Sequence, residues 1–182
     1  MIKTFKYFNN HRNLYCALGL TLVFILYISL VLVPLSGCFR LDIGSNSLGL
    51  SIYNIEIVQE FFHARDQAQL LCYSQFLQLW DIIFAVVSTV MNGSWIIYLF
   101  KNKRLLLVAP TVLGMIADWS ENFLELLMLK TYSNSGAISE TLVSLGSGLN
   151  IFKLTMSGLT WLIILVGIIL ALKTFLTKPK LT

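Results

Sequence analysis

Residues 14–35, LYCALGLTLVFILYISLVLVPL, form a stretch of 22 residues without a charged side chain. A helix of about 20 apolar residues crosses the hydrocarbon core of a bilayer, which is about 30 Å thick. Three more mostly apolar runs of similar length follow, at residues 76–100, 105–129 and 149–172. We therefore predict an all-α fold, in which residues 1–182 form one membrane domain, a four-transmembrane-helix bundle.

Composition and charge placement support this class of protein. Apolar residues make up 57% of the chain and charged residues 12%, about half the charged share of soluble domains. Nine of the thirteen Lys and Arg residues lie in the two tails and in the connection between the second and third helices. Because positively charged connections stay on the cytoplasmic side, we expect an N-in/C-in, multi-pass protein of a bacterial inner membrane. No continuous basic face with aromatic residues is present, so a nucleic-acid partner is not expected.

The first predicted helix ends in Leu35-Ser36-Gly37-Cys38, which has the pattern of a bacterial lipoprotein cleavage site. Its apolar run exceeds the roughly 7–15 residues of a signal peptide, so we expect a retained helix and an unmodified Cys38. Cys72 belongs to the same predicted outer side, where an oxidising compartment permits a bridge. We expect two free buried thiols, with a Cys38–Cys72 disulfide as the alternative. No C-x-x-C pair exists, which argues against a thiol-redox enzyme.

About 40 residues separate the first two helices, more than a simple connection needs. Within them, residues 52–74 repeat apolar side chains every third or fourth position, which predicts an amphipathic helix on the outer surface with Ser51 as N-cap. Glu60 and His63 have the Glu-x-x-His spacing of di-iron bundles, which use two such pairs. The chain's other histidine is His11, in the N-terminal tail. His63 is therefore either solvent-exposed or a ligand-binding residue above the polar site.

The third apolar run overlaps ADWSENFLELLMLK, residues 117–130, which has four polar residues on one helical face. Counted at about 1.5 Å per residue from the predicted cytoplasmic boundaries, polar residues of the neighbouring helices reach the same outer-leaflet level. Charged groups within a membrane face the interior and pair, although Glu125 lies near enough to the interface to extend toward it. The predicted cluster comprises Asp81, Asp118, Glu121, Asn122, Glu125 and Lys153.

Four carboxylates that face one lysine cannot all be ionised in a site without water. Either some of the carboxyl groups are protonated, or water or a cation enters the site. The residues do not identify a cofactor, and a divalent cation is one candidate. As acid/base groups or metal ligands, the candidate catalytic residues are Asp81, Asp118 and Glu121. The candidate ligand-binding residues are Asn122, Lys153, His63 and Glu125.

We expect an integral membrane protein with an outer-leaflet polar pocket for a small ligand, a lipid headgroup or a cation. An intramembrane hydrolase or transferase would use the carboxyl groups for proton transfer, whereas a transporter would use their protonation as a switch. The alternative is a structural or accessory subunit, in which polar contacts only hold the helices together. Expected partners are the lipid bilayer, a lipid or small-molecule ligand, and a second copy or another membrane protein.

The stretch Leu79-Trp80-Asp81-Ile82-Ile83-Phe84, followed by Ala117-Asp118-x-x-Glu121-Asn122 and Lys153, resembles a group of small four-helix membrane proteins. Members of that group carry an L-D-x-x-F element in the second span and D-x-x-E-N in the third. The resemblance covers residues 57–153. It implies a four-span architecture in which the polar residues of these motifs act as a set, and it implies no activity.

Overall fold

The computed structural model describes residues 2–41, 47–100 and 104–176, and within those ranges it contains helices and no β-strand. The first rod consists of α1 (Ile2–Tyr27), the π-helical segment η1 (Ile28–Leu32) and α2 (Val33–Ser36). The second consists of α4 (Gln67–Gln75), the π-helical segment η3 (Phe76–Asp81) and α5 (Ile82–Leu99).

Two further long helices follow, α6 (Arg104–Ser135) and α7 (Glu140–Leu176). Gly136 follows α6 with a φ of 68°, the left-handed conformation that commonly ends a helix and that glycine adopts without strain. Between the two rods lie the short elements η2 (Leu48–Leu50) and α3 (Ile55–His63). We call residues 47–66, which contain both short elements, the cap.

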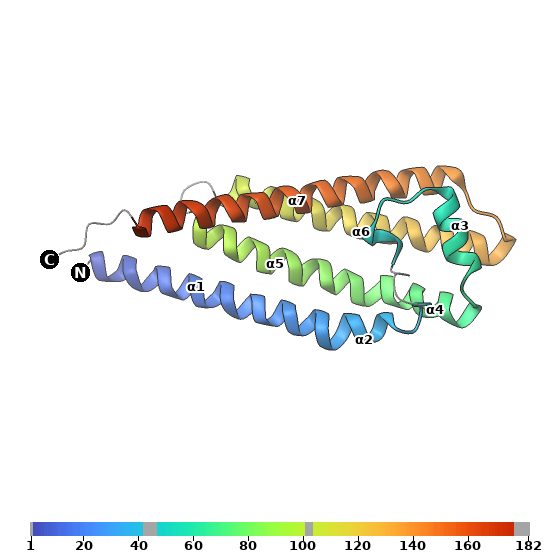
Figure 1. The fold of residues 1–182 in the computed structure, drawn as a ribbon, viewed down its shortest axis with the longest axis horizontal. Coiled ribbons are helices and arrows are strands. Elements are labelled where there is room, and N and C mark those ends of the chain that lie inside the picture. Colours follow the sequence, from blue (N-terminus) through green and yellow to red (C-terminus); the bar gives the residue numbers. More distant parts are fainter. Residues whose placement is uncertain (1, 42–46, 101–103, 177–182) are drawn as a thin grey trace.

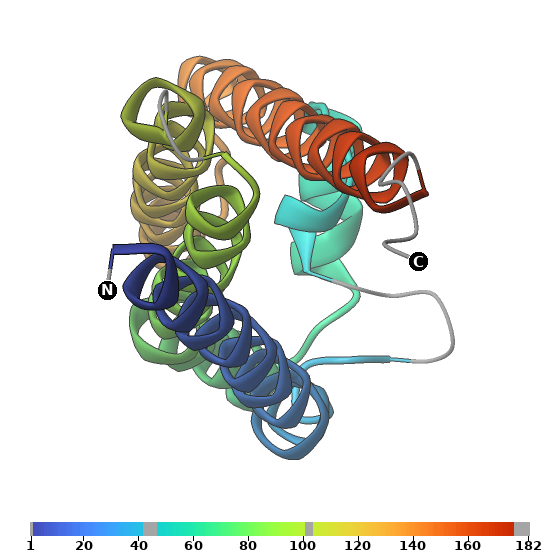
Figure 2. The same ribbon diagram turned by 90° about the vertical axis from the view of Figure 1, so that its left-hand side faces the viewer.

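The long helices lie side by side, and the start of α1 and the end of α7 lie at the same end of the molecule (Figure 1). α3 lies at the opposite end. α1 packs on α5, α5 packs on α6 and α7, and α6 packs along α7. Viewed along the long axis, α1, α5, α6 and α7 follow one another around an arc, and α3 falls between the two ends of that arc (Figure 2).

Three segments of the described chain are long and apolar enough to cross a membrane: Arg12–Ser36, Gln67–Leu99 and Glu140–Thr174. They correspond to the predicted runs at 14–35, 76–100 and 149–172. Large apolar side chains such as Leu30 and Leu165 are more than half exposed on these helices, as a helix in contact with lipid requires. α6 contains the remaining run, 105–129, but it is more polar, and its crossing of the membrane stays a prediction.

The amphipathic helix predicted at residues 52–74 is two helices in the structure. Asn54, and not Ser51, caps α3 by accepting a 3.0 Å hydrogen bond from Ile57 N. The chain then breaks at Asp66, whose side chain accepts from Gln69 N while the Gln69 side chain accepts from Asp66 N, a capping box that starts α4. This break shifts the helical phase, so Leu71 of the predicted apolar stripe is exposed whereas Tyr73 is buried.

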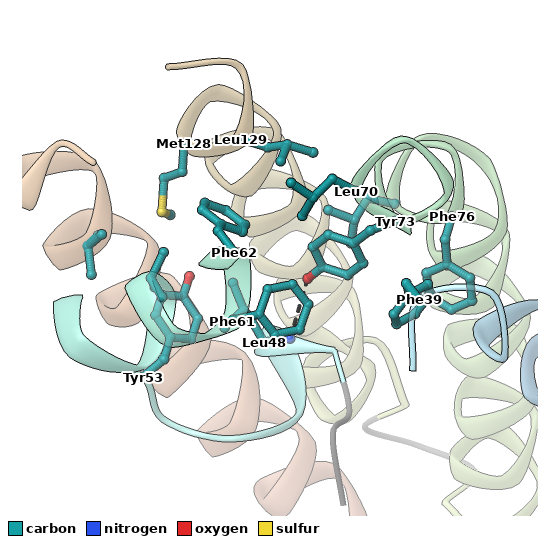
Figure 3. Packing of buried hydrophobic residues seen from close by; sticks show 13 residues of the cluster. Phe39, Leu48, Tyr53, Phe61, Phe62, Leu70, Tyr73, Phe76, Met128 and Leu129 are labelled. Carbon is teal, nitrogen blue, oxygen red and sulfur yellow. Dashed lines mark hydrogen bonds between the residues drawn. The ribbon is translucent and has the colours of Figure 1, made fainter. Parts of the chain in front are cut away.

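Buried hydrophobic residues collect at the end of the molecule that α3 covers (Figure 3). Phe39 follows the first rod, Phe61 and Phe62 belong to α3, and Tyr73 and Phe76 belong to the second rod. Their rings pack against one another, with centroids 4.9 Å apart for both Phe39–Tyr73 and Phe61–Tyr73. Burying each such side chain contributes about 1.5–3 kcal/mol, so the cap is a packed part of the fold.

Arg65 fastens the cap to the end of the first rod. Its Nε donates to Phe39 O and its Nη1 to Phe61 O, both at 2.7 Å, and its guanidinium carbon lies 3.4 Å from the centroid of the Phe61 ring. Burial lowers the pKa of this guanidinium. Two charge-assisted hydrogen bonds and a ring contact offset the desolvation of the buried charge.

Cys38 and Cys72 form a disulfide, with their Cα atoms 6.3 Å apart, a separation within the usual range for a bridged pair. The expectation of two free buried thiols was therefore wrong, and the alternative pairing is the one observed. A bridged Cys38 has no thiol for lipid attachment. The bond joins the end of the first rod to α4 across a sequence separation of 34 residues.

Candidate functional site

Lys153 of α7 is the centre of the polar cluster. Its Nζ lies 2.5 Å from Glu121 Oε2 and 3.1 Å from Asp118 Oδ1, both on α6. Positions 118 and 121 are three residues apart, so a helix presents both to the same neighbour. Glu121 is fully buried and Asp118 is 8% exposed. Pairing with the ammonium group offsets the desolvation of both carboxylates.

Asp81 and Asn122 make the second contact of the cluster. Asp81 is the last residue of η3, and its Oδ2 accepts a 2.9 Å hydrogen bond from Asn122 Nδ2 on α6. Asn122 is 3% exposed. Asn122 follows Glu121 directly, so α6 presents one carboxylate toward α7 and an amide toward the second rod. The helix therefore connects two neighbours through adjacent side chains.

Glu125 lies inside the protein. Its predicted depth had also permitted the side chain to extend toward the membrane interface, and it does not do so. Its side chain is fully buried, and Tyr73 OH donates a hydrogen bond to its Oε2. The same hydroxyl accepts from Leu48 N at 3.3 Å and lies 3.2 Å from Ser47 Oγ. Tyr73 therefore connects an acid of α6 to the backbone of the cap.

The cap closes over the cluster through its backbone. Lys153 Nζ donates to Gly49 O at 2.9 Å, and Asn150 Nδ2, one helical turn earlier, donates to Ser51 O at 2.7 Å. A Cβ at position 49 would lie 2.9 Å from Lys153 Nζ and 3.3 Å from Glu121 Oε1. Only glycine lets the backbone approach the ion pair this closely.

Tyr53 of the cap is a further neighbour of the acids. It is 2% exposed, and its pKa is raised by burial and then by the carboxylates of Glu125 and Glu121. The hydroxyl therefore stays protonated and able to donate. Sequence reasoning placed Tyr53 in an apolar stripe and missed this polar tip, although buried tyrosine hydroxyls usually have a polar partner.

Gly49 and Tyr73 were also not predicted as site residues. Gly49 belongs to the stretch rich in Gly, Ser and Asn at residues 44–51, whose composition indicates a turn but not its place in the fold. Tyr73 lies at the end of the predicted outer helix, where a buried and an exposed tyrosine have the same sequence pattern. Neither residue carried a signal that pointed to the cluster.

His63 and Glu60 lie outside the cluster. Both are exposed, and His63 Nδ1 lies 3.5 Å from Tyr132 OH near the end of α6. The structure thus brings together six of the seven candidate site residues and leaves His63 on the surface.

The donor set does not favour the candidate divalent cation. Among the described residues, no group of three or more His, Cys, Asp or Glu side chains could hold a metal ion. The Lys153 ammonium lies between Asp118 and Glu121, where a bridging cation would have to bind. These two acids already have a positive charge between them.

A cavity of about 440 Å³ opens beside the cluster. Asp81, Asp118 and Lys153 line it, whereas Glu121 and Glu125 are not among its lining residues. Asp118 Oδ2 is buried without a hydrogen-bond partner among the described residues. A ligand in the cavity would therefore reach two of the three candidate catalytic acids.

The two π-helical segments both border this cavity and contact each other. η3 contributes Phe76 and Asp81 to the lining, and η1 contributes Ile28 and Leu32. A π-helical turn holds an extra residue per turn, is rare, and frequently occurs at functional sites.

No family model, no curated protein and no solved structure matches the chain. Only the geometry of the site therefore bears on the function.

Proposed function

We propose that this chain is an integral membrane protein whose cavity binds a small amphiphile, a lipid or a lipid-like molecule. Its head group donates hydrogen bonds, as an ammonium or hydroxyl does, to Asp81 and Asp118. The observation that carries this proposal is that Lys153 is already paired with acids of α6, whereas Asp118 Oδ2 has no hydrogen-bond partner among the described residues and Asp81 accepts one bond.

The burial of the charged side chains of α6 supports the proposal that α6 is a fourth membrane span. Glu121 and Glu125 are fully buried, whereas Ile116 is 50% and Phe123 61% exposed. A helix whose charged face is covered by its neighbours and whose outer face is apolar is compatible with lipid. Together with the placement of the basic residues, this favours an N-in/C-in, four-span protein of a bacterial inner membrane with the cap outside.

The size and the walls of the cavity fit an amphiphile. Its volume of about 440 Å³ lies within the roughly 300–1,000 Å³ of small-molecule sites, which combine mostly apolar walls with a few polar groups. Phe84, Met115 and Leu154 supply apolar wall beside Asp81, Asp118 and Lys153. An alkyl chain would contact these apolar residues while its head group contacts Asp81 and Asp118.

The unused hydrogen-bonding capacity of Asp81 and Asp118 indicates the charge of the ligand's head group. Asp118 Oδ1 contacts Lys153 and its Oδ2 has no partner among the described residues. Asp81 accepts one bond through Oδ2, and a carboxylate can accept about four. Both groups therefore lack donors, and burying such an acceptor unpaired is unfavourable. An ammonium or hydroxyl beside Asp81 and Asp118 relieves this deficit, whereas an anionic head group at the same place adds repulsion.

Calorimetric titration of octylamine into the protein in lipid nanodiscs tests this proposal, with empty nanodiscs as the reference. We expect saturable binding that Asp118→Asn and Asp81→Asn each weaken about tenfold, as the loss of one charge-assisted hydrogen bond predicts. Glu60→Gln, which removes the same charge from the exposed face of α3, should leave binding unchanged. Equal binding of octylamine and octanoate, or binding indifferent to both Asp variants, would refute it.

A second candidate is supported by the contacts of the cap. Lys153 with Gly49, Asn150 with Ser51 and Tyr73 with Glu125 hold the cap on the helices, which is what a structural or accessory subunit needs. If that is the whole role, Asp118→Asn changes stability while no amphiphile binds. An enzyme would need Asp81 or Asp118 for proton transfer, since Glu121 does not line the cavity.

A further inference from the structure

The cavity has a second polar level below the charged one. Asp81 on the second rod, Asp118 on α6 and Lys153 on α7 form the upper level, and Ala85 and Met115 line the cavity one turn farther from the cap. Toward the end of the cavity away from the cap, the lining is polar again on all three helices, with Ser88, Thr89, Asn92, Thr111, Ser157 and Thr160. These six side chains are uncharged.

The spacing between the two levels follows from the helices. Ser88 is seven residues beyond Asp81, Thr111 seven before Asp118, and Thr160 seven beyond Lys153, so each pair is about 10 Å apart at 1.5 Å per residue. Asn92 lies four residues deeper still. The three helices thus place Ser88, Thr111 and Thr160 at a common depth, with Asn92 one turn deeper.

Three of these six side chains donate hydrogen bonds within the protein. Thr160 Oγ1 donates to Met156 O at 2.8 Å, Thr89 Oγ1 to Thr111 O at 3.4 Å, and Asn92 Nδ2 lies 3.4 Å from Ser88 Oγ. Asn92 is 6% exposed, and its Oδ1 is buried without a hydrogen-bond partner among the described residues. A buried amide oxygen is usually paired, so Asn92 Oδ1 lacks a donor in this part of the cavity.

We propose that Asn92 and the hydroxyl groups around it form a second, neutral subsite that binds a hydroxyl or amide N–H of the ligand. The proposal rests on the amphiphile-binding function and narrows the ligand to a molecule with two polar ends. One end is a cationic or hydroxyl head group at Asp81 and Asp118. The other is a neutral hydrogen-bond donor about 10–16 Å away, after an apolar chain.

Paired probes test the subsite separately from the head-group site. In nanodiscs, 8-amino-1-octanol should bind about tenfold more tightly than octylamine, because its hydroxyl supplies the missing donor. Asn92→Leu should abolish this advantage and leave the affinity for octylamine unchanged. Should Asn92→Leu fail to fold, Thr160→Val provides the measurement, and it should reduce the advantage. Thr155→Val is its matched control, because Thr155 makes the same 2.8 Å bond to the residue four earlier but is exposed and outside the cavity lining.

The outcomes separate the two proposals. Equal affinity of both amines, with octylamine still dependent on Asp118, would overturn the subsite and leave the head-group site standing. An advantage of the amino alcohol that persists in Asn92→Leu or in Thr160→Val would likewise overturn it. If neither amine binds, both proposals are overturned.

Discussion

Lys153 Nζ and the carbonyl oxygen of Gly49 form a 2.9 Å hydrogen bond that joins the polar face of α7 to the backbone of the cap. The same ammonium is paired with two acids of α6. One side chain thus connects two long helices and the segment that covers them. The position of the cap and the charge state of the cluster are therefore linked.

Gly49→Ala should destabilise the protein by about 1–3 kcal/mol, the usual effect of inserting a methyl group into a packed site. The new Cβ would lie 2.9 Å from Lys153 Nζ, whose ion pairs restrict its movement. Gly148→Ala on α7 is the control, since nothing lies within 4 Å of its added Cβ. Unfolding by SDS in mixed micelles measures both, and equal stability of the two variants would contradict the close approach.

Lys153→Met should lower the free energy of unfolding by about 3–5 kcal/mol, because it leaves buried carboxylates without their counter-charge. Adding Asp118→Asn and Glu121→Gln should recover much of the loss by removing those charges. Lys130→Met, at an exposed position, should change stability by less than about 0.5 kcal/mol. A triple variant as unstable as the single one would show that Lys153 acts through packing instead.

The Cys38–Cys72 disulfide should be present in protein isolated without reductant, and peptide mass mapping should recover the two cysteines in one linked pair. Replacing both by Ser should lower stability by about 3–4 kcal/mol, from the chain entropy of a loop of this length. Cys16→Ser removes an exposed free thiol and should have no effect. Alkylation of Cys38 under non-reducing conditions would refute the bridge.

Arg65→Lys should destabilise the cap although it keeps the charge. A lysine ammonium cannot reproduce the two 2.7 Å guanidinium bonds to Phe39 O and Phe61 O together with the ring contact. We expect a loss of about 1–3 kcal/mol, the penalty of leaving a buried acceptor unpaired. Faster hydrogen exchange in α3 would locate the effect, whereas Arg40→Lys, at an exposed position, should leave α3 unchanged.

The N-in/C-in topology predicts that a cysteine at Ser135, an exposed residue at the end of α6, reacts with a membrane-impermeant maleimide from outside. Each cysteine is introduced into the Cys16→Ser variant, in which the Cys38–Cys72 disulfide stays intact. Asn46 and Asn102 lie outside the described residues. A cysteine at Asn46 should react from outside, whereas a cysteine at Asn102 should react only after the membrane is permeabilised. Outside labelling at Asn102 would overturn the topology.

The sequence by itself determined the helical class, the apolar segments and six residues of the polar cluster. Run length against bilayer thickness is a property of the chain alone. The convergence of Asp81, Asp118, Glu121, Asn122, Glu125 and Lys153 also followed, because charged groups in apolar helices are driven to one another. Helical spacing and depth then specified which residues could meet.

The tertiary structure decided what the cap does. Whether a polar loop folds back over a bundle depends on contacts between residues far apart in the chain, such as Lys153 with Gly49 and Tyr73 with Glu125. The local periodicity of the sequence does not indicate these long-range contacts. The Asp66 capping box broke one periodic pattern into two helices, which turned Tyr73 inward. The cavity likewise arises from the packing of three long helices and the first rod, so no single segment contains it.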